Sequence, residues 1–256
     1  MTQRLNGKTA LVTGSTSNIG RSIGLALAAE GAHVIVSGRD AARGDAVVAA
    51  IRTKGGQADF VGADLNGTPE RSSLLAEQAA ERLGGRIDVL VNNAGVYPPH
   101  TTDVADGDLF DLIYGVNVKA PFFLTQAVVP LMIAAGGGVV INLGSWISRL
   151  AVPSSPIYSS SKGAMESLTR AWAAEFGPKG VRVNAISPGV IRDPDLDATV
   201  ERPSSRMMVG TPAGRAGHPD AIASAAVYLA SDDAAFVHGT VIDVDGGRTG
   251  VAVVAA

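Results

Sequence analysis

The sequence predicts an α/β fold, a doubly wound sheet of about seven mostly parallel strands flanked by helices. The first reason is that short apolar runs alternate along the chain with longer segments whose apolar residues recur at helical spacing. The second is a glycine-containing loop of small residues between the first apolar run and the first helical segment. The third is length. A chain of 256 residues that is 46% hydrophobic and 18% charged can form one core, so residues 1–256 are expected to be a single domain.

The expected strands are short apolar runs, and the fourth is apolar enough to be covered on both faces, as in a parallel sheet. They lie at residues 9–13, 33–37, 58–62, 87–91, 139–143, 181–187 and 240–244.

The expected helices have apolar residues at helical spacing, and several are bounded by proline at the start or glycine at the end. They lie at residues 19–30, 41–54, 69–83, 108–135 (one or two helices), 155–176 and 219–230.

Residues 188–217 break this alternation with several prolines and charges, so they are expected to form a long loop with a short helix at 196–209. Long loops in compact domains are usually functional, and this one is predicted to border the substrate.

Composition excludes some functions. The net charge of −3 and the scattered Lys and Arg residues offer no basic stripe for nucleic acid, and the absence of cysteine excludes disulfides and thiol chemistry. We expect no metal site. Residues 1–8 lack the layout of a signal peptide, so a cytoplasmic location is expected. The apolar stretch 127–143 is interrupted by Pro130, glycines and Asn142, which favours a buried helix, a turn and a strand over a membrane span.

The loop from Thr13 to Gly20 lies after the first strand and before the first helix. Small residues there let backbone N–H groups and the helix N-terminus approach a pyrophosphate closely. A merely tight turn is the alternative. The position of the loop favours dinucleotide binding, and with it a Rossmann-type sheet.

Tyr158 and Lys162 are four residues apart in the predicted helix 155–176, so they share one face. A neighbouring ammonium favours the ionised phenol, and the pKa of Tyr158 is expected to fall from about 10 toward neutrality. Such a pair can transfer a proton. The pattern also arises by chance, as a half-buried Tyr over a surface Lys, so the rest of the chain must decide.

Together these motifs resemble the short-chain dehydrogenase/reductase family over nearly the whole chain. The family's glycine loop corresponds to Thr13–Gly20, and its acidic residue after the third strand corresponds to Asp64. Its Asn-Asn-Ala-Gly motif stands at 92–95. Its catalytic set corresponds to Asn117, Ser145, Tyr158 and Lys162.

The resemblance implies that Tyr158 gives a proton to a carbonyl oxygen while Ser145 holds that oxygen by a hydrogen bond. Lys162 would lower the Tyr158 pKa and grip the nicotinamide ribose, and Asn117 would order a water behind Lys162. Taken singly, Ser145 could be a strand-end turn and Asn117 a helix kink or cap. Asp64 could be only a turn former.

The expected cofactor contacts combine these motifs with the residues around them. They are Gly14, Thr16, Ser17, Asn18, Ile19, Gly20, Arg39, Asp64, Leu65, Asn92, Ala94, Gly95, Tyr158, Lys162, Pro188, Gly189 and Ile191. Asn92 is also expected to tie neighbouring strands together. The expected substrate contacts are Tyr97, Ser145, Trp146, Ile147 and Tyr158, together with the loop 192–208.

Two positions depart from the family pattern. Asn18 replaces the second glycine of the loop, and Asn tolerates left-handed dihedral angles better than most residues, so the loop can survive. Asp193 stands where the family usually has a Thr near the carboxamide. An ionised carboxylate cannot donate, which leaves that contact in doubt.

NADP(H) is expected to be preferred, with NAD(H) possible, because Arg39 follows the second strand, where a guanidinium suits a 2′-phosphate. Asp40 could bind the ribose hydroxyls instead, but it directly precedes a predicted helix and is better explained as its N-cap. Against NADP(H), Ser17 stands where many NADP-preferring relatives have a basic residue.

The predicted function is NAD(P)(H)-dependent reversible oxidoreduction of a carbonyl or alcohol, on a 3-oxoacyl-thioester-like, sugar, polyol or other mid-sized substrate. Alternatives are a nucleotide-bound sensor or scaffold without turnover, and an isomerase or lyase on the same fold. A homo-oligomer, most simply a tetramer, is expected because the helices 108–135 and 155–176 are apolar around most of their girth. The sheet alone could also cover them.

Overall fold

Every strand of the sheet is parallel to its neighbours. The computed structural model describes residues 3–150, 152–196 and 203–252, and within them the strand order is β3-β2-β1-β4-β5-β6-β7. The strands are β1 (Thr9–Val12), β2 (His33–Gly38), β3 (Gln57–Gly62), β4 (Val89–Asn92), β5 (Gly138–Leu143), β6 (Val181–Pro188) and β7 (Val241–Val244).

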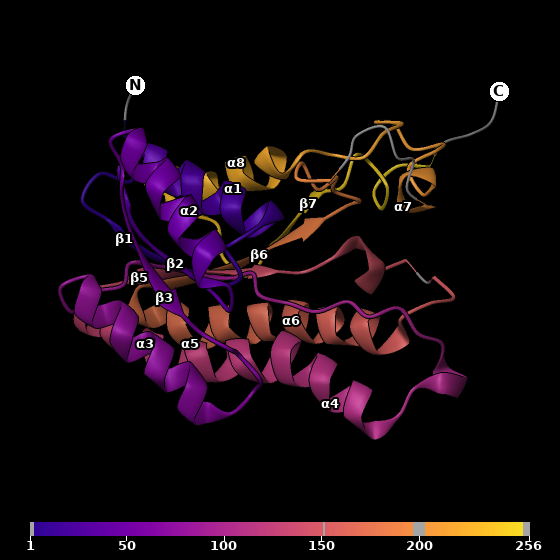
Figure 1. Ribbon diagram of the computed structural model, residues 1–256, viewed down its shortest axis with the longest axis horizontal. Helices are drawn as coiled ribbons and strands as arrows, with labels where there is room; N and C mark the ends of the chain where they lie inside the picture. The colour runs from indigo at the N-terminus through magenta and orange to yellow at the C-terminus, as the bar shows by residue number, and fades with distance from the viewer. Residues whose placement is uncertain (1–2, 151, 197–202, 253–256) are drawn as a thin grey trace.

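Helices cover both faces of the sheet (Figure 1). One face carries α1 (Asn18–Ala29), α2 (Ala41–Thr53) and α8 (Pro219–Ala230). The other carries α3 (Pro69–Arg82), α4 (Gly107–Tyr114), α5 (Ala120–Ala134) and α6 (Pro156–Phe176). Shorter elements are η1 (Thr102–Val104), the π-helical turn η2 (Gly115–Lys119), η3 (Trp146–Ser148), η4 (Gly177–Lys179), α7 (Pro203–Arg206) and η5 (Asp232–Ala234).

The strands read as continuous apolar runs because both faces are buried. Side chains alternate between faces along a strand, so Val12 joins the core under α1 and α8 while Leu11 joins the core under α3, α5 and α6. Ile23 and Leu27 of α1 fill the first core, and Leu124 of α5 fills the second. The fold class predicted from sequence is thereby confirmed.

The strand order creates the position for a ligand. The chain runs outward from β1 through β2 to β3 and then returns to β4, which pairs with β1 on its other side. In open parallel sheets, ligands bind at the carboxyl ends of strands where the order reverses. The loops after β1 and β4 therefore meet, so closely that a Cβ on Gly14 would lie 2.9 Å from the Cα of Ala94.

The predicted strands, and the predicted helices other than 196–209, are present with small differences in their ends. The fourth strand begins at Val89 rather than at residue 87, because the carboxylate of Asp88 turns to accept a hydrogen bond from the Thr9 N–H at 2.8 Å. The predicted helix 108–135 is two α-helices joined by η2. Of the predicted helix 196–209, the described part shows only α7, and residues 197–202 lie outside the described residues.

One continuous helical run, Gly107–Ala134, is long and apolar enough to cross a membrane by length and composition alone. In the structure it belongs to the helix layer on the sheet, with 44% of its most apolar window buried. Leu124, Val128 and Met132 are fully enclosed in the core. The predicted buried helix, turn and strand over residues 127–143 are observed as the end of α5, a glycine turn and β5.

Candidate active site

The glycine loop presents an open helix N-terminus. Ser17 is the N-cap of α1 in extended conformation, but its side chain makes no capping hydrogen bond. The first N–H groups of α1 are therefore available to an anion. A Cβ on Gly20 would lie 2.3 Å from the Gly14 carbonyl oxygen, so only glycine allows this packing. Asn18 has φ +42, which confirms that asparagine adopts the left-handed geometry there.

A cavity of about 590 Å³ begins at this loop and runs along the carboxyl ends of β1 to β4. Eleven of the expected cofactor residues line it. They are Gly14, Thr16, Ser17, Asn18, Ile19, Gly20, Arg39, Asp64, Leu65, Ala94 and Gly95. Residues from distant parts of the chain thus converge on one cavity.

Arg39 and Asp40, which follow β2, differ in their contacts. The Asp40 carboxylate accepts a hydrogen bond from the Arg43 N–H at 3.0 Å, which confirms it as the N-cap of α2. Arg39 is exposed, lines the cavity and pairs with no carboxylate among the described residues. Asp64 also lines the cavity and makes an exposed ion pair with Arg71 at 3.5 Å.

A second cavity of about 420 Å³ adjoins the first, and the two share Asn18, Ile19, Asn93, Gly95 and Val96. It is lined by the remaining predicted cofactor contacts except Asn92, and by all five predicted substrate contacts. These are Tyr97, Ser145, Trp146, Ile147, Tyr158, Lys162, Pro188, Gly189 and Ile191.

Tyr158 and Lys162 project from the first turns of α6 into this second cavity. The Lys162 Nζ donates to the Leu143 carbonyl oxygen at 2.9 Å and lies 5.7 Å from the centroid of the Tyr158 ring. Burial lowers the pKa of Lys162 to about 8. Burial also raises the pKa of Tyr158 to about 12, and this outweighs the lowering caused by its hydrogen bond with Ser145. The sequence-based expectation of a lowered Tyr158 pKa is therefore wrong for the protein alone, because desolvation dominates.

Ser145 lies just after β5 and caps η3, accepting a hydrogen bond from the Ile147 N–H at 3.4 Å. It is thus both the strand-end turn and the partner of Tyr158, so the two readings of this residue are compatible. The Tyr97 ring meets the Tyr158 ring edge-on with centroids 4.5 Å apart. The phenol is therefore fixed by side chains from two loops.

Asn117 lies in the π-helical turn η2, an irregularity common at functional sites. It is buried and does not line either cavity, and its amide exchanges hydrogen bonds with the backbone of Val96 and donates to Ser161. A Cβ on Gly95 would lie 3.3 Å from the Asn117 Oδ1 and 3.5 Å from the Lys162 Nζ. Asn117 and Lys162 therefore both approach Gly95, and Asn117 holds the loop after β4. The water that Asn117 is expected to order behind Lys162 stays a prediction.

Asn92 corrects one expectation. Its amide donates to Thr125 at 3.1 Å and to Asn142 at 2.9 Å, so it ties β4 to β5 and α5 as predicted, but it lines neither cavity. The reason is strand alternation, which directs neighbouring side chains to opposite faces. Asn93 takes the cleft position instead and donates to the carbonyl oxygens of Thr13 and Gly14.

Asp193 also turns away from the cleft. Its carboxylate accepts from the Asp195 N–H at 3.0 Å, and Asp195 pairs with Arg21 of α1 at 2.9 Å. Among the described residues of the loop 192–208, Met207 is the one that lines the second cavity. Sequence reasoning missed Arg248, whose guanidinium stacks 4.6 Å from the Trp146 ring centroid and donates to the Met207 carbonyl. No motif marked it.

The residues present fit a dinucleotide. An uncapped helix N-terminus suits the pyrophosphate, Arg39 and Asp64 line the same cavity, and Lys162 lines the adjoining cavity together with Tyr158. The fold and the site together define a dinucleotide-dependent oxidoreductase.

Comparison with known proteins agrees with this class of enzyme. A family model described as enoyl-(acyl carrier protein) reductase matches residues 14–249. Cyclopentanol dehydrogenase of Comamonas sp. (strain NCIMB 9872) is 36% identical over 248 residues, which cover 96% of this chain and 98% of that one. The 7alpha-hydroxysteroid dehydrogenase of Escherichia coli (strain K12) is 38% identical over 245 residues, 95% of each chain.

A solved structure from Beutenbergia cavernae, with NADP bound at low occupancy, is 36% identical, has a TM-score of 0.89 and covers 98% of this chain and 100% of that one. The chain belongs to the short-chain dehydrogenase/reductase family, oxidoreductases that act on alcohol and carbonyl groups with NAD(P).

Proposed function

We propose that this enzyme interconverts a neutral, largely apolar ketone and the corresponding secondary alcohol, with Tyr158 as the proton donor and acceptor. One observation carries the proposal. Tyr158, Ser145 and Lys162 converge in a cavity that adjoins the dinucleotide cleft, and that cavity is otherwise lined mainly by apolar side chains.

Each of the three side chains has a distinct task. A Tyr158 phenol whose pKa is raised to about 12 is protonated at neutral pH, so it can donate to the oxygen of a carbonyl substrate. The Ser145 hydroxyl, hydrogen-bonded to Tyr158, would hold that same oxygen. The Lys162 ammonium would stabilise the phenolate left after donation. When bound, the nicotinamide supplies or accepts the hydride.

The apolar lining supports the choice of substrate. Among the described residues that line the second cavity, Lys162 is the one charged side chain, and its Nζ already donates to the Leu143 carbonyl oxygen. Tyr97, Trp146 and Met207 provide an apolar wall. A polyol would leave several hydroxyls without partners there, whereas a cyclic or long-chain ketone would be covered. Two relatives are named for cyclopentanol and a hydroxysteroid, alcohols with apolar bodies.

We further propose that NADP(H) is preferred to NAD(H). Arg39 lines the first cavity and pairs with none of the described carboxylates, which suits a 2′-phosphate. The nearest competing acceptor, Asp40, is committed to capping α2. A relative structure with NADP bound supports the same choice.

The protein is proposed to act in the cytoplasm as a homo-oligomer, most simply a tetramer, without nucleic acid or membrane partners. Phe110, Leu112 and Phe122 of α4 and α5 are exposed. An apolar hollow of about 420 Å³ between α5 and α6 is lined by Phe122, Phe123 and Leu168. A second copy of this surface would cover these side chains.

The function is tested by incubating the pure protein with NADPH or NADH and a panel of cyclic ketones, 3-oxoacyl thioesters, sugars and enoyl thioesters while following nicotinamide absorbance. We expect oxidation of NADPH with cyclic ketones. Turnover without a change in absorbance would indicate an isomerase or lyase, and cofactor binding without any turnover would indicate a sensor or scaffold. Reduction of the enoyl thioester alone would contradict the ketone assignment.

A further inference from the structure

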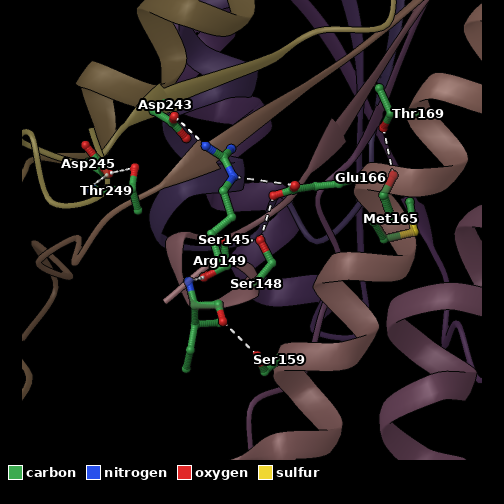
Figure 2. A network of polar contacts seen from close by, with 11 residues as sticks. Ser145, Ser148, Arg149, Ser159, Met165, Glu166, Thr169, Asp243, Asp245 and Thr249 are labelled. Atoms are coloured by element: carbon green, nitrogen blue, oxygen red, sulfur yellow. Dashed lines mark hydrogen bonds and ion pairs between the residues drawn. The ribbon is translucent and has the colours of Figure 1, made fainter. Parts of the chain in front are cut away.

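The turn that follows Ser145 is fastened to α6, the helix that carries Tyr158, by two side chains (Figure 2). The Ser148 Oγ lies 2.6 Å from the Glu166 Oε1, and the Ser159 Oγ donates to the Ile147 carbonyl oxygen at 2.7 Å. Ser159 and Glu166 are seven residues apart, two helical turns, so they lie on one face of α6. This face sets the position of the turn.

Ser148 connects this face to Ser145 itself. Its backbone N–H donates to the Ser145 carbonyl oxygen at 3.0 Å, and its Oγ lies 2.7 Å from the same oxygen. A hydroxyl has one proton to donate. The 2.6 Å distance to Glu166 is that of a charge-assisted bond, which fixes the hydroxyl, while the backbone bond keeps the Ser145 carbonyl in place.

The Glu166 carboxylate is in turn paired with Arg149. It is buried, with 7% of its surface exposed, and a carboxylate in such a place needs a partner. The Arg149 Nε lies 3.5 Å from the Glu166 Oε2, and the Arg149 Nη1 lies 2.6 Å from the Asp243 Oδ2. Figure 2 shows Arg149 reaching from the turn toward both carboxylates, one on α6 and one on β7. The network therefore joins three elements around the site.

Helix α6 also contacts the chain just before Ser145. Lys162, one turn before Glu166, donates to the Leu143 carbonyl oxygen at 2.9 Å, two residues ahead of Ser145. The segment bearing Ser145 is thus attached to α6 before and after the catalytic hydroxyl. The distance between the Ser145 hydroxyl and Tyr158 therefore depends on both contacts with α6.

We propose that Ser148 and Glu166 are positioning residues, which act by holding the Ser145 hydroxyl in register with the Tyr158 phenol. The proposal rests on the proposed role of Ser145 in the reaction. Neither residue lines the second cavity, so neither is expected to touch the substrate. Their contribution must therefore pass through Ser145.

A double-mutant cycle between Ser148→Ala and Ser145→Ala tests this, with hydride transfer measured in single turnovers at excess enzyme so that slow variants remain measurable. In the wild-type background we expect Ser148→Ala to lower the rate about tenfold and leave the NADPH dissociation constant within about twofold. In the Ser145→Ala background the same change should alter the rate by less than about twofold, because the group it positions is gone.

An equal loss in both backgrounds, or no loss in the wild-type background, would overturn the proposal. Ser148→Thr, which keeps the hydroxyl, should restore the rate, and a failure to restore it would also count against positioning. If Ser145→Ala itself had no effect, the proposed role of Ser145 would be wrong, which is a separate outcome.

Glu166→Gln gives a second probe because it keeps the size of the side chain and removes the ion pair with Arg149. We expect a severalfold loss of rate with cofactor affinity unchanged. The matched control is Glu30→Gln at the C-cap of α1, which removes a 2.6 Å ion pair with Arg4. Equal rate losses in both variants would show a general effect of lost ion pairs and overturn the proposal.

Discussion

The ammonium of Lys162 lies 5.7 Å from the centre of the Tyr158 ring; Lys162 is buried and Tyr158 is partly buried. In the protein alone, burial opposes charge on each of them. The pKa of Tyr158 is raised to about 12 and that of Lys162 is lowered to about 8. At neutral pH the pair is therefore a neutral phenol beside an ammonium whose burial is unfavourable. Tyr158 can therefore donate a proton, and the buried charge of Lys162 lowers the free energy of unfolding.

Lys162→Met should therefore stabilise the protein without cofactor. At pH 7 the unfolded lysine, with its ordinary pKa of 10.5, and the folded one, at about 8, are both protonated, and the folded protein bears the full cost of the buried charge. Each pKa unit corresponds to about 1.4 kcal/mol, and the substitution also loses the Nζ bond to Leu143, so we expect a gain of roughly 1–3 kcal/mol.

The pH dependence identifies the cause of that gain. Between pH 8 and 10.5 the unfolded wild type binds more protons than the folded one, so its stability rises with pH and the advantage of Lys162→Met should shrink toward zero. Urea unfolding at several pH values measures this. A gain that stayed constant from pH 7 to pH 10 would show that packing, and not the charge, is responsible.

Arg39→Ala should reduce the preference for NADPH. Removing a guanidinium from the 2′-phosphate is expected to lower kcat/KM with NADPH about tenfold or more and to leave kcat/KM with NADH nearly unchanged. The matched control is Arg43→Ala, which removes a neighbouring exposed guanidinium that does not line the cavity. A wild-type preference for NADH, or an unchanged ratio in Arg39→Ala, would remove Arg39 from this role.

Trp146→Ala should weaken binding of apolar substrates. The indole lines the second cavity directly after Ser145 and is backed by Arg248. We expect KM for a cyclic ketone to rise about tenfold, with cofactor affinity unchanged, because apolar contact area is lost. Steady-state kinetics across a series of ketone sizes checks this, and unchanged kinetics for every substrate would show that Trp146 is only packing.

Phe122→Glu should dissociate the proposed homo-oligomer. The phenyl ring is partly exposed beside the apolar hollow between α5 and α6, and a carboxylate there would be buried unpaired at an interface. Leu74→Glu on α3, an exposed apolar position outside the hollow, is the control. Light scattering should give an oligomer for wild type and the control, and a smaller species for Phe122→Glu. A monomeric wild type at micromolar concentration would contradict the assembly.

Much of the fold was predictable because its signals are local. Apolar runs with both faces buried give the parallel strands, and the glycine loop lies between β1 and α1 as expected. The Asp40 cap and the left-handed Asn18 followed from residue chemistry and are confirmed. The predicted convergence of Ser145, Tyr158 and Lys162 in one cavity came from the family motifs.

What the sequence could not show depends on contacts between distant segments. The direction of the Tyr158 pKa shift is set by how deeply the fold buries the phenol, and a spacing of four residues carries no information on burial. Asn92 and Asn93 are adjacent, and only the strand's orientation decides which one faces the cleft. Arg149 and Arg248 act through partners far along the chain, with no motif to mark them.

The most direct test of the proposed function is the rate of hydride transfer in Tyr158→Phe, measured in single turnovers alongside the NADPH dissociation constant. Only the phenolic hydroxyl is removed, while the ring that meets Tyr97 is kept. We predict a rate lower by about 10²- to 10⁴-fold, with cofactor affinity and unfolding free energy close to those of the wild type. A variant that retained most of its hydride-transfer rate would show that Tyr158 is not the proton donor and would contradict the mechanism.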